Sequence, residues 1–185
     1  MKKEKLLIKS FIICLIGFTI FSCGKDEATN LTTDKFTFLK VGRSWRYTEF
    51  DSTGIFIMDL TFIAQESLGN GNFQMLDCEI FHPAGIWHMT DNSFGYRDTI
   101  TEIIVKANAK LNDIIYNISG SDTISSFKVV GINIQKQVPA GTYPCYKVEM
   151  QKPLNFGTYY INKDFGIICF SHANGNNTVL ISKSF

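Results

Sequence analysis

The stretch at residues 145–150, Cys-Tyr-Lys-Val-Glu-Met, decides the fold, because its side chains alternate in character along the chain. The even-numbered residues are all apolar, whereas two of the odd-numbered ones are the charged Lys147 and Glu149. Successive side chains of a β-strand point to opposite faces, so this period of two predicts a strand with one buried face. One solvent-exposed face and one buried face are typical of an antiparallel sheet.

The same period recurs on both sides of this stretch. Residues 56–64 place Phe, Met, Leu, Phe and Ala at every second position, with Asp59 and Thr61 between them, which predicts a long strand with one apolar face. Gly, Asn, Asp and Pro separate such runs, as expected of turns. Further strands are predicted over residues 36–40, 44–50, 73–81, 100–105, 127–134, 157–162, 166–171 and 178–182.

About ten strands and hardly any helical spacing define the fold class. At most a turn or two of helix is expected, near residues 106–113. We therefore predict a mainly β fold, formed by one large curved antiparallel sheet with little helix beyond the N-terminal segment. The pattern leaves two alternatives open: an open half-barrel and a closed barrel.

The first 22 residues have the composition of a secretory signal peptide. Four lysines lie within residues 1–9 and precede the apolar run Phe11–Phe21. As a helix this run would be about 16 Å long, well short of the roughly 30 Å of a hydrocarbon core. A basic start and a short apolar run predict export and removal of residues 1–22, not a membrane span.

The end of this segment, Ile20-Phe21-Ser22-Cys23, resembles the lipobox of bacterial lipoproteins. The resemblance implies that Cys23 is lipidated and becomes the N-terminus. Two or three acyl chains hold a protein stably to a bilayer, whereas one does so only marginally. The partner implied for Cys23 is therefore the lipid bilayer.

The residues that follow, Gly24-Lys25-Asp26-Glu27, resemble the acidic export signal of surface lipoproteins of Bacteroidetes. Residues 23–34 are also rich in polar residues and suit a flexible tether. The two readings are compatible. They imply an outer-membrane protein held by its lipid, on the periplasmic face or at the cell surface.

The rest of the chain, residues 35–185, is expected to be a single β domain. Without the signal peptide, the chain has 14 basic and 16 acidic residues. Such a near-neutral balance offers no broad basic surface of the kind that nucleic acids require, so no nucleic-acid partner is expected.

The residues typical of catalysis or metal binding are scarce. No His-Glu-x-x-His, Gly-x-Ser-x-Gly, phosphate loop or Cys-x-x-Cys occurs, so we expect no enzyme, no cofactor and no metal site. His82 and His88 could face each other across a turn, but solvent-exposed turn histidines are far commoner than metal ligands. Of the remaining cysteines, Cys78 suits a buried apolar face, which leaves Cys145 and Cys169 as the more plausible disulfide pair, with the pairing left open.

Three further blocks resemble a pattern of Bacteroidetes envelope lipoproteins. They are Leu-Lys-Val-Gly-Arg-Ser-Trp-Arg-Tyr at 39–47, Val-Pro-Ala-Gly-Thr-Tyr-Pro-Cys-Tyr-Lys-Val at 138–148, and the stretch from Tyr159-Tyr160 to Phe165-Gly166-Ile167-Ile168. The resemblance implies a β-rich fold similar to the half-barrels of the LolA and LolB lipoprotein carriers. It implies no catalytic residues.

Two non-catalytic functions therefore stay open. A curved sheet rich in aromatic residues could leave a cleft for a lipid or another apolar ligand, with Trp45, Phe62 and Trp87 as candidate contacts. Alternatively, the domain could be an accessory protein that binds a protein partner of the envelope. Aromatic residues on strand faces more often form a filled hydrophobic core than a cleft. Whether the structure has a cleft lined by these residues therefore distinguishes the two hypotheses.

Overall fold

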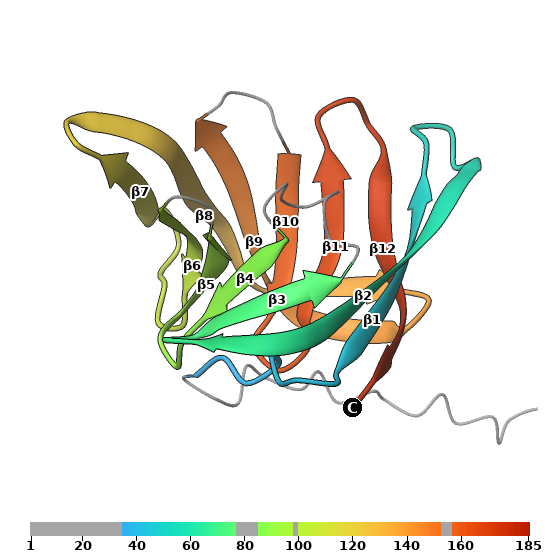
Figure 1. Cartoon of the computed structure of the whole chain (residues 1–185). Helices are drawn as coiled ribbons and strands as arrows, with labels where there is room; N and C mark the ends of the chain where they lie inside the picture. Colours follow the sequence, from blue (N-terminus) through green and yellow to red (C-terminus); the bar gives the residue numbers. More distant parts are fainter. Residues whose placement is uncertain (1–34, 77–84, 98–99, 153–156) are drawn as a thin grey trace, which may run out of the picture.

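A computed structural model describes residues 35–76, 85–97, 100–152 and 157–185. These residues form twelve strands and no helix (Figure 1). Accordingly, no helix of the described residues is long and apolar enough to cross a membrane. The predicted signal peptide and tether, with Cys23, lie outside the described residues. The strands are β1 (Ser44–Phe50), β2 (Phe56–Gly69), β3 (Asn72–Leu76), β4 (Ile86–Met89), β5 (Ser93–Arg97), β6 (Thr101–Lys106), β7 (Ile114–Ser119), β8 (Asp122–Val138), β9 (Gly141–Lys152), β10 (Gly157–Asn162), β11 (Gly166–His172) and β12 (Asn177–Ser184).

All twelve strands belong to one sheet, in the order β6-β5-β4-β3-β2-β1-β12-β11-β10-β9-β8-β7. Every neighbouring pair is antiparallel, and β1 pairs with β12, so the first and last strands lie side by side. The sheet curls until its two edge strands, β6 and β7, come into contact, which gives a nearly closed barrel (Figure 1). The predicted fold class, a large curved antiparallel sheet, is confirmed.

The interior of the barrel is filled by aromatic side chains. Register pairs Trp45 of β1 with Phe62 of β2, and both are 0% exposed. Trp87, Phe94 and Tyr159 join them in one cluster of buried residues. Full burial of a large apolar side chain contributes about 1.5–3 kcal/mol, so this cluster is a principal source of stability.

The predicted strand at residues 36–40 is wrong, although its alternating pattern is real. Phe36 donates its backbone N–H to the carbonyl of Asp91 at 3.0 Å, in the β4–β5 turn, and Thr37 donates to the carbonyl of Lys163 at 3.0 Å, in the β10–β11 turn. The segment thus crosses the lower end of the barrel in Figure 1 instead of pairing along one strand. We call residues 36–39 the plug, because Phe36 and Phe38 point into the core.

Other differences also follow from tertiary packing. Strands β4, β5 and β7 were not predicted, and residues 107–113 form turns where a helical turn or two was expected. Of the predicted strand at 73–81, β3 ends at Leu76, and residues 77–81 lie outside the described part. In β2, Phe62 and Ala64 are buried as expected, but Phe56 and Met58 are exposed, because the β1–β2 hairpin rises above the rim.

The longest hairpin, β8–β9, reaches across the outside of the barrel. Lys136 of β8 places its Nζ 4.4 Å from the ring centre of Tyr160 on β10. At the hairpin tip, Ala140 donates its backbone N–H to the carbonyl of Leu180 on β12. The Val-Pro-Ala-Gly block of the sequence is thus the turn that fastens this hairpin to the C-terminal strand.

Candidate functional site: the seam between the edge strands

The seam between β6 and β7 is closed by side-chain hydrogen bonds. No backbone hydrogen bond joins these two strands within the described residues. Instead, the Asn117 amide accepts from the backbone N–H of Ile103 at 2.8 Å and donates to its carbonyl at 3.0 Å. An amide group has the same donor and acceptor as a peptide group, so Asn117 replaces a missing strand partner at this point.

Asn117 is itself held by a buried polar network. Its Nδ2 donates to Ser125 Oγ at 3.0 Å, and Ser125 Oγ donates to Glu102 Oε2 at 2.6 Å. Burial raises the pKa of the nearby Tyr159 hydroxyl, and the charge of Glu102 raises it further. The inner side of the seam therefore carries the Glu102 side chain, hydrogen-bonded to Ser125, near the neutral phenol of Tyr159.

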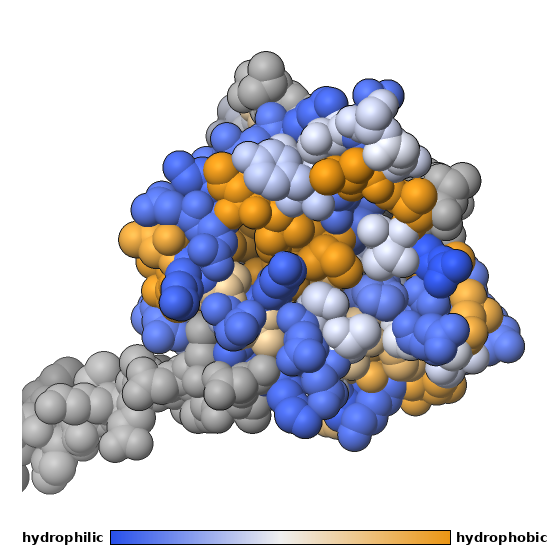
Figure 2. Space-filling view, turned by 90° about the vertical axis from the view of Figure 1, so that its left-hand side faces the viewer, coloured by the Kyte–Doolittle hydropathy of each residue, from blue (hydrophilic) through white to orange (hydrophobic). Residues whose placement is uncertain are grey.

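The outer side of the same seam is apolar. Strand β7 alternates, with Ile115 and Asn117 inside and three large residues outside. Ile114 is 44% exposed, and Tyr116 and Ile118 are each 59% exposed. With Ile124 of β8, which is 36% exposed, they form what we call the seam patch. Figure 2 views the side of the barrel that carries β7 and shows apolar side chains gathered there among hydrophilic ones.

The three candidate ligand contacts from the sequence lie together, but in the core. Trp87 packs 5.7 Å from Trp45 and 6.2 Å from Phe62 between ring centres, and all three are 0% exposed. Phe38 of the plug covers them, at 6.2 Å from Trp45 and 6.3 Å from Trp87. An apolar ligand that approaches this cluster from the lower end of the barrel would have to displace the plug.

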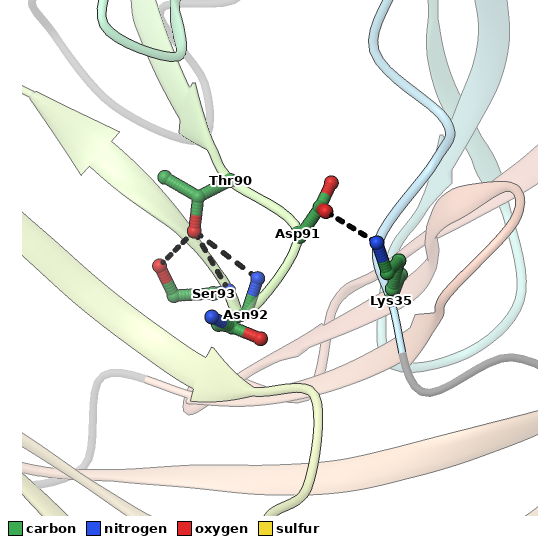
Figure 3. A network of polar contacts seen from close by, with 5 residues as sticks. All are labelled: Lys35, Thr90, Asp91, Asn92 and Ser93. Carbon is green, nitrogen blue, oxygen red and sulfur yellow. Dashed lines mark hydrogen bonds and ion pairs between the residues drawn. The ribbon is translucent and has the colours of Figure 1, made fainter.

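Polar contacts hold the plug at both ends. Lys35 Nζ lies 2.7 Å from Asp91 Oδ2, in a turn whose backbone is fixed by the Thr90 hydroxyl (Figure 3). Thr37 donates its hydroxyl to Asp164 at 3.0 Å. Arg43 Nη1 donates to the carbonyls of Thr37 and Phe38 at 3.0 and 2.8 Å. Of these contacts, the exposed Lys35–Asp91 pair contributes least, because water screens it.

The predicted disulfide between Cys145 and Cys169 is not formed. Both residues are free and fully buried, and burial raises the pKa of both thiols. Cys145 lies on β9 and Cys169 on β11, with β10 between them. Strands two apart are separated by roughly 9–10 Å, beyond the Cα distance of about 7 Å that a disulfide tolerates.

The histidines that the structure describes serve as local hydrogen-bonding groups. His88 Nδ1 lies 3.0 Å from Asn72 Oδ1, whereas His82 lies outside the described residues. His172 Nε2 lies 3.0 Å from Thr178 Oγ1 and its ring packs on Phe170 at 4.3 Å. Among the described residues, no three His, Cys, Asp or Glu side chains gather to hold a metal ion.

A cleft of about 420 Å³ opens at the upper end of the barrel. Its walls come from β9, β10 and β11 and include Met150, Gly157 and His172. Burial lowers the pKa of His172, partly offset by the charge of Glu49, so its imidazole stays neutral at neutral pH. Ser171, also in the wall, donates to Asn177 Oδ1 at 2.7 Å. The histidine and the serine are thus engaged in separate contacts.

Known proteins share the fold but not the sequence. No family model and no curated protein sequence matches the chain. A solved structure of a "putative exported protein with YmcC-like fold" from Bacteroides fragilis NCTC 9343 is similar, with a TM-score of 0.51 and 12% identity over 82% of this chain and 99% of that one. The two chains share a fold.

A second structure, a "putative lipoprotein" from Parabacteroides distasonis ATCC 8503, has a TM-score of 0.41 and 15% identity, over 81% of this chain and 99% of that one. At 12% identity the comparison with the Bacteroides fragilis structure extends to the fold alone. The resemblance to LolA and LolB therefore stays a prediction.

Sequence reasoning predicted β6, at residues 100–105, but missed β7 and with it the seam. Its apolar outer residues Ile114, Tyr116 and Ile118 carry the same period-two signal that revealed the other strands. The buried Asn117 sits in the middle of this run, and a polar residue at an inward position is the signal that could have marked a special contact.

Proposed function

We propose that the chain is an exported bacterial lipoprotein, held at the outer membrane by acyl chains on Cys23, whose barrel binds a protein partner and catalyses no reaction. The lipobox-like sequence around Cys23 supports the anchor. The exported protein from Bacteroides fragilis, whose fold the chain shares, supports export. The outer membrane is favoured over other sites by the acidic residues that follow Cys23.

The observation that carries partner binding is the distribution of apolar side chains. The interior is filled, with Trp45, Phe62 and Trp87 at 0% exposure, whereas the seam patch exposes three large side chains in a row along one edge strand. Contiguous exposed apolar surface in a soluble domain usually marks an interaction site. A tyrosine among isoleucines is also typical of the centre of protein interfaces.

Cysteine accessibility in living cells tests the patch. In the variant Ile118→Cys, a small maleimide reagent should label position 118 at least five-fold more slowly in cells than in the purified protein, because a bound partner covers it. Leu111→Cys, an exposed apolar position in the β6–β7 connection, is the matched control and should react equally in both. Equal rates in cells and in purified protein at position 118 would rule out an occupied patch.

The anchor has a separate test. Replacing Cys23→Ala should leave the protein as an uncut precursor or release it from the membrane, since no thiol remains to carry the lipid. Membrane fractionation with intact-mass measurement reads out both results. A membrane-bound variant of mature mass would contradict lipidation at Cys23.

A second candidate function is the binding of an apolar ligand under the plug. It is favoured by one observation: Phe38 occupies an aromatic site formed by Trp45, Trp87 and Phe94, at 4.9 Å from the Phe94 ring. The non-acylated chain from residue 24 should then bind an environment-sensitive apolar dye, in competition with a fatty acid. Saturable binding that strengthens in Phe38→Ala supports this function, and no binding by either protein excludes it.

A further inference from the structure

A second apolar surface lies at the tip of the β1–β2 hairpin, far from the seam in the sequence. Four consecutive residues there, Ile55, Phe56, Ile57 and Met58, are 66%, 57%, 38% and 42% exposed. Strand geometry alone exposes every second residue of a strand, so four in succession require that both faces of the hairpin stand clear of the barrel. Runs of this kind oppose solubility unless a partner covers them. We call these four residues the tip.

The tip is held rigidly. One carboxylate oxygen of Asp51 accepts from the backbone N–H groups of Thr53 and Ile55, both at 2.8 Å, and from the Thr53 hydroxyl at 2.7 Å. These hydrogen bonds hold the pKa of Asp51 below its usual range. The β1–β2 turn also contacts the neighbouring β11–β12 turn. A Cβ added to Gly175 of the β11–β12 turn would lie 2.8 Å from Ser52 Cβ, so the two turns are in close contact. A preorganised apolar surface loses little entropy on binding.

The charges of the hairpin are mainly acidic. Between Arg46 and Thr61 the chain has three acidic residues, Glu49, Asp51 and Asp59, and one basic residue. That base, Arg46, pairs with Asp59 at 2.7 Å, so these two charges offset each other. Glu49 is 6% exposed and accepts from Asn176 at 3.0 Å, which leaves Asp51 as the more accessible acid beside the tip. A negative charge without an exposed basic partner disfavours the anionic surface of a membrane, which attracts Lys and Arg.

The tip also lies far from the described ends of the chain. It is at the upper end of the barrel in Figure 1, whereas the described chain begins at Lys35 and ends at Phe185 at the lower end. A partner bound at the tip therefore leaves both of these ends uncovered.

We infer that the tip docks into an apolar groove of a protein partner whose rim is basic, at the end of the barrel opposite to Lys35 and Phe185. The apolar run supplies the buried contact, and the negative charge of Asp51 beside it selects the sign of the rim. This surface is distinct from the seam patch, so each can be disproved without the other.

Photo-crosslinking of the full chain in its native host tests the proposal, with p-benzoylphenylalanine in place of Ile57. The expected result is one adduct with a protein identified by mass spectrometry, and none from the same probe at Gln137, an exposed position on the β8–β9 hairpin. Two variants of equal size change the charge beside the probe in opposite directions. Ile55→Lys should reduce the adduct at least ten-fold, because the rim repels it, whereas Ile55→Glu should retain a clearly larger share.

Four outcomes overturn the proposal. An adduct of twice the chain mass would identify a second copy, and an adduct with lipid would identify a membrane. Equal losses of the adduct in Ile55→Lys and Ile55→Glu would show that the groove of the partner has no basic rim. No adduct from protein that is present at the wild-type level, with cooperative unfolding intact, would show that the tip has no partner. The seam experiment does not depend on any of these results.

Discussion

At the scale of single residues, the close packing at the lower end of the barrel depends on a glycine. Gly166 has a φ of +83°, and a Cβ at this position would lie 2.8 Å from Cδ2 of the Phe38 ring. Phe38 cannot move aside freely, because it is fully buried among other aromatic rings. The glycine thus allows both the left-handed backbone conformation of the turn and the close packing of Phe38 against it.

The variant Gly166→Ala separates these two roles when it is compared with Gly42→Ala. Gly42 has a similar φ of +87° but no atom within 4 Å of the added Cβ. Gly42→Ala should therefore cost only backbone strain, about 1 kcal/mol. Gly166→Ala should cost about 1–3 kcal/mol more, because it also overpacks the core. Urea unfolding of both variants measures the difference, and equal values would show that the plug yields to the new methyl group.

At the scale of elements, two segments complete a barrel that the strand ladder alone leaves unfinished. The plug fills the lower end with Phe36 and Phe38, and Asn117 joins the edge strands. Each replaces a regular ladder with a few specific contacts. The stability of these regions therefore depends on few side chains.

The plug should be stabilised mainly by the Phe38 ring, and hardly at all by the Lys35–Asp91 ion pair. Phe38→Ala should lower the free energy of unfolding by about 3–5 kcal/mol, the usual cost of deleting a buried aromatic side chain. Lys35→Ala, three residues away, should cause no measurable change, since both charges of the Lys35–Asp91 pair are largely exposed. Chemical denaturation compares the two, and a larger effect of Lys35→Ala would reverse this assignment.

The seam should open when the Asn117 bridge is removed. Asn117→Ala leaves the backbone groups of Ile103 without their partners and should cost about 1–3 kcal/mol. Hydrogen exchange should accelerate in β6 and β7 before other strands. Asn108→Ala is the control, because Asn108 is exposed in the connection between the same strands. Unchanged exchange at Ile103 in Asn117→Ala would mean that the seam closes by other contacts.

At the scale of the whole molecule, stability should depend on pH through two half-buried histidines. Burial lowers the pKa of His172, and burial with the nearby charge of Arg97 lowers that of His88. As the pH falls from 7 to 5, through the ordinary histidine pKa of about 6.5, the unfolded chain takes up protons that the folded chain resists. The folded state should therefore lose stability over this range.

Thermal unfolding between pH 7 and pH 5 measures this effect. The double variant His172→Gln and His88→Gln should show a smaller decline than the wild type, whereas His82 remains in both proteins. Asp51 and Asp59, whose pKa values are lowered by hydrogen bonds, contribute losses mainly below about pH 4 and so fall outside the window. A decline of equal size in both proteins would assign the pH dependence to other groups.

The sequence by itself determined the fold class and most of the strands. Period two along residues 145–150 and 56–64 depends only on which face meets water, and β9 and β2 cover these residues. It also named Trp45, Phe62 and Trp87 together as candidate contacts of a ligand, and the structure places them side by side, but in the filled core. Local alternation is sufficient for this, because it encodes burial along each strand.

Only the tertiary structure decided how the barrel ends and closes. The pattern at residues 36–40 does not distinguish a strand from a plug, because both bury Phe36 and Phe38, and only the partners of the backbone groups distinguish them. The separation of Cys145 and Cys169 by β10, the bridge from Asn117 to Ile103 and the exposure of the seam patch likewise depend on strand order. Strand order arises from contacts between residues far apart in the chain, and a local pattern carries no information about them.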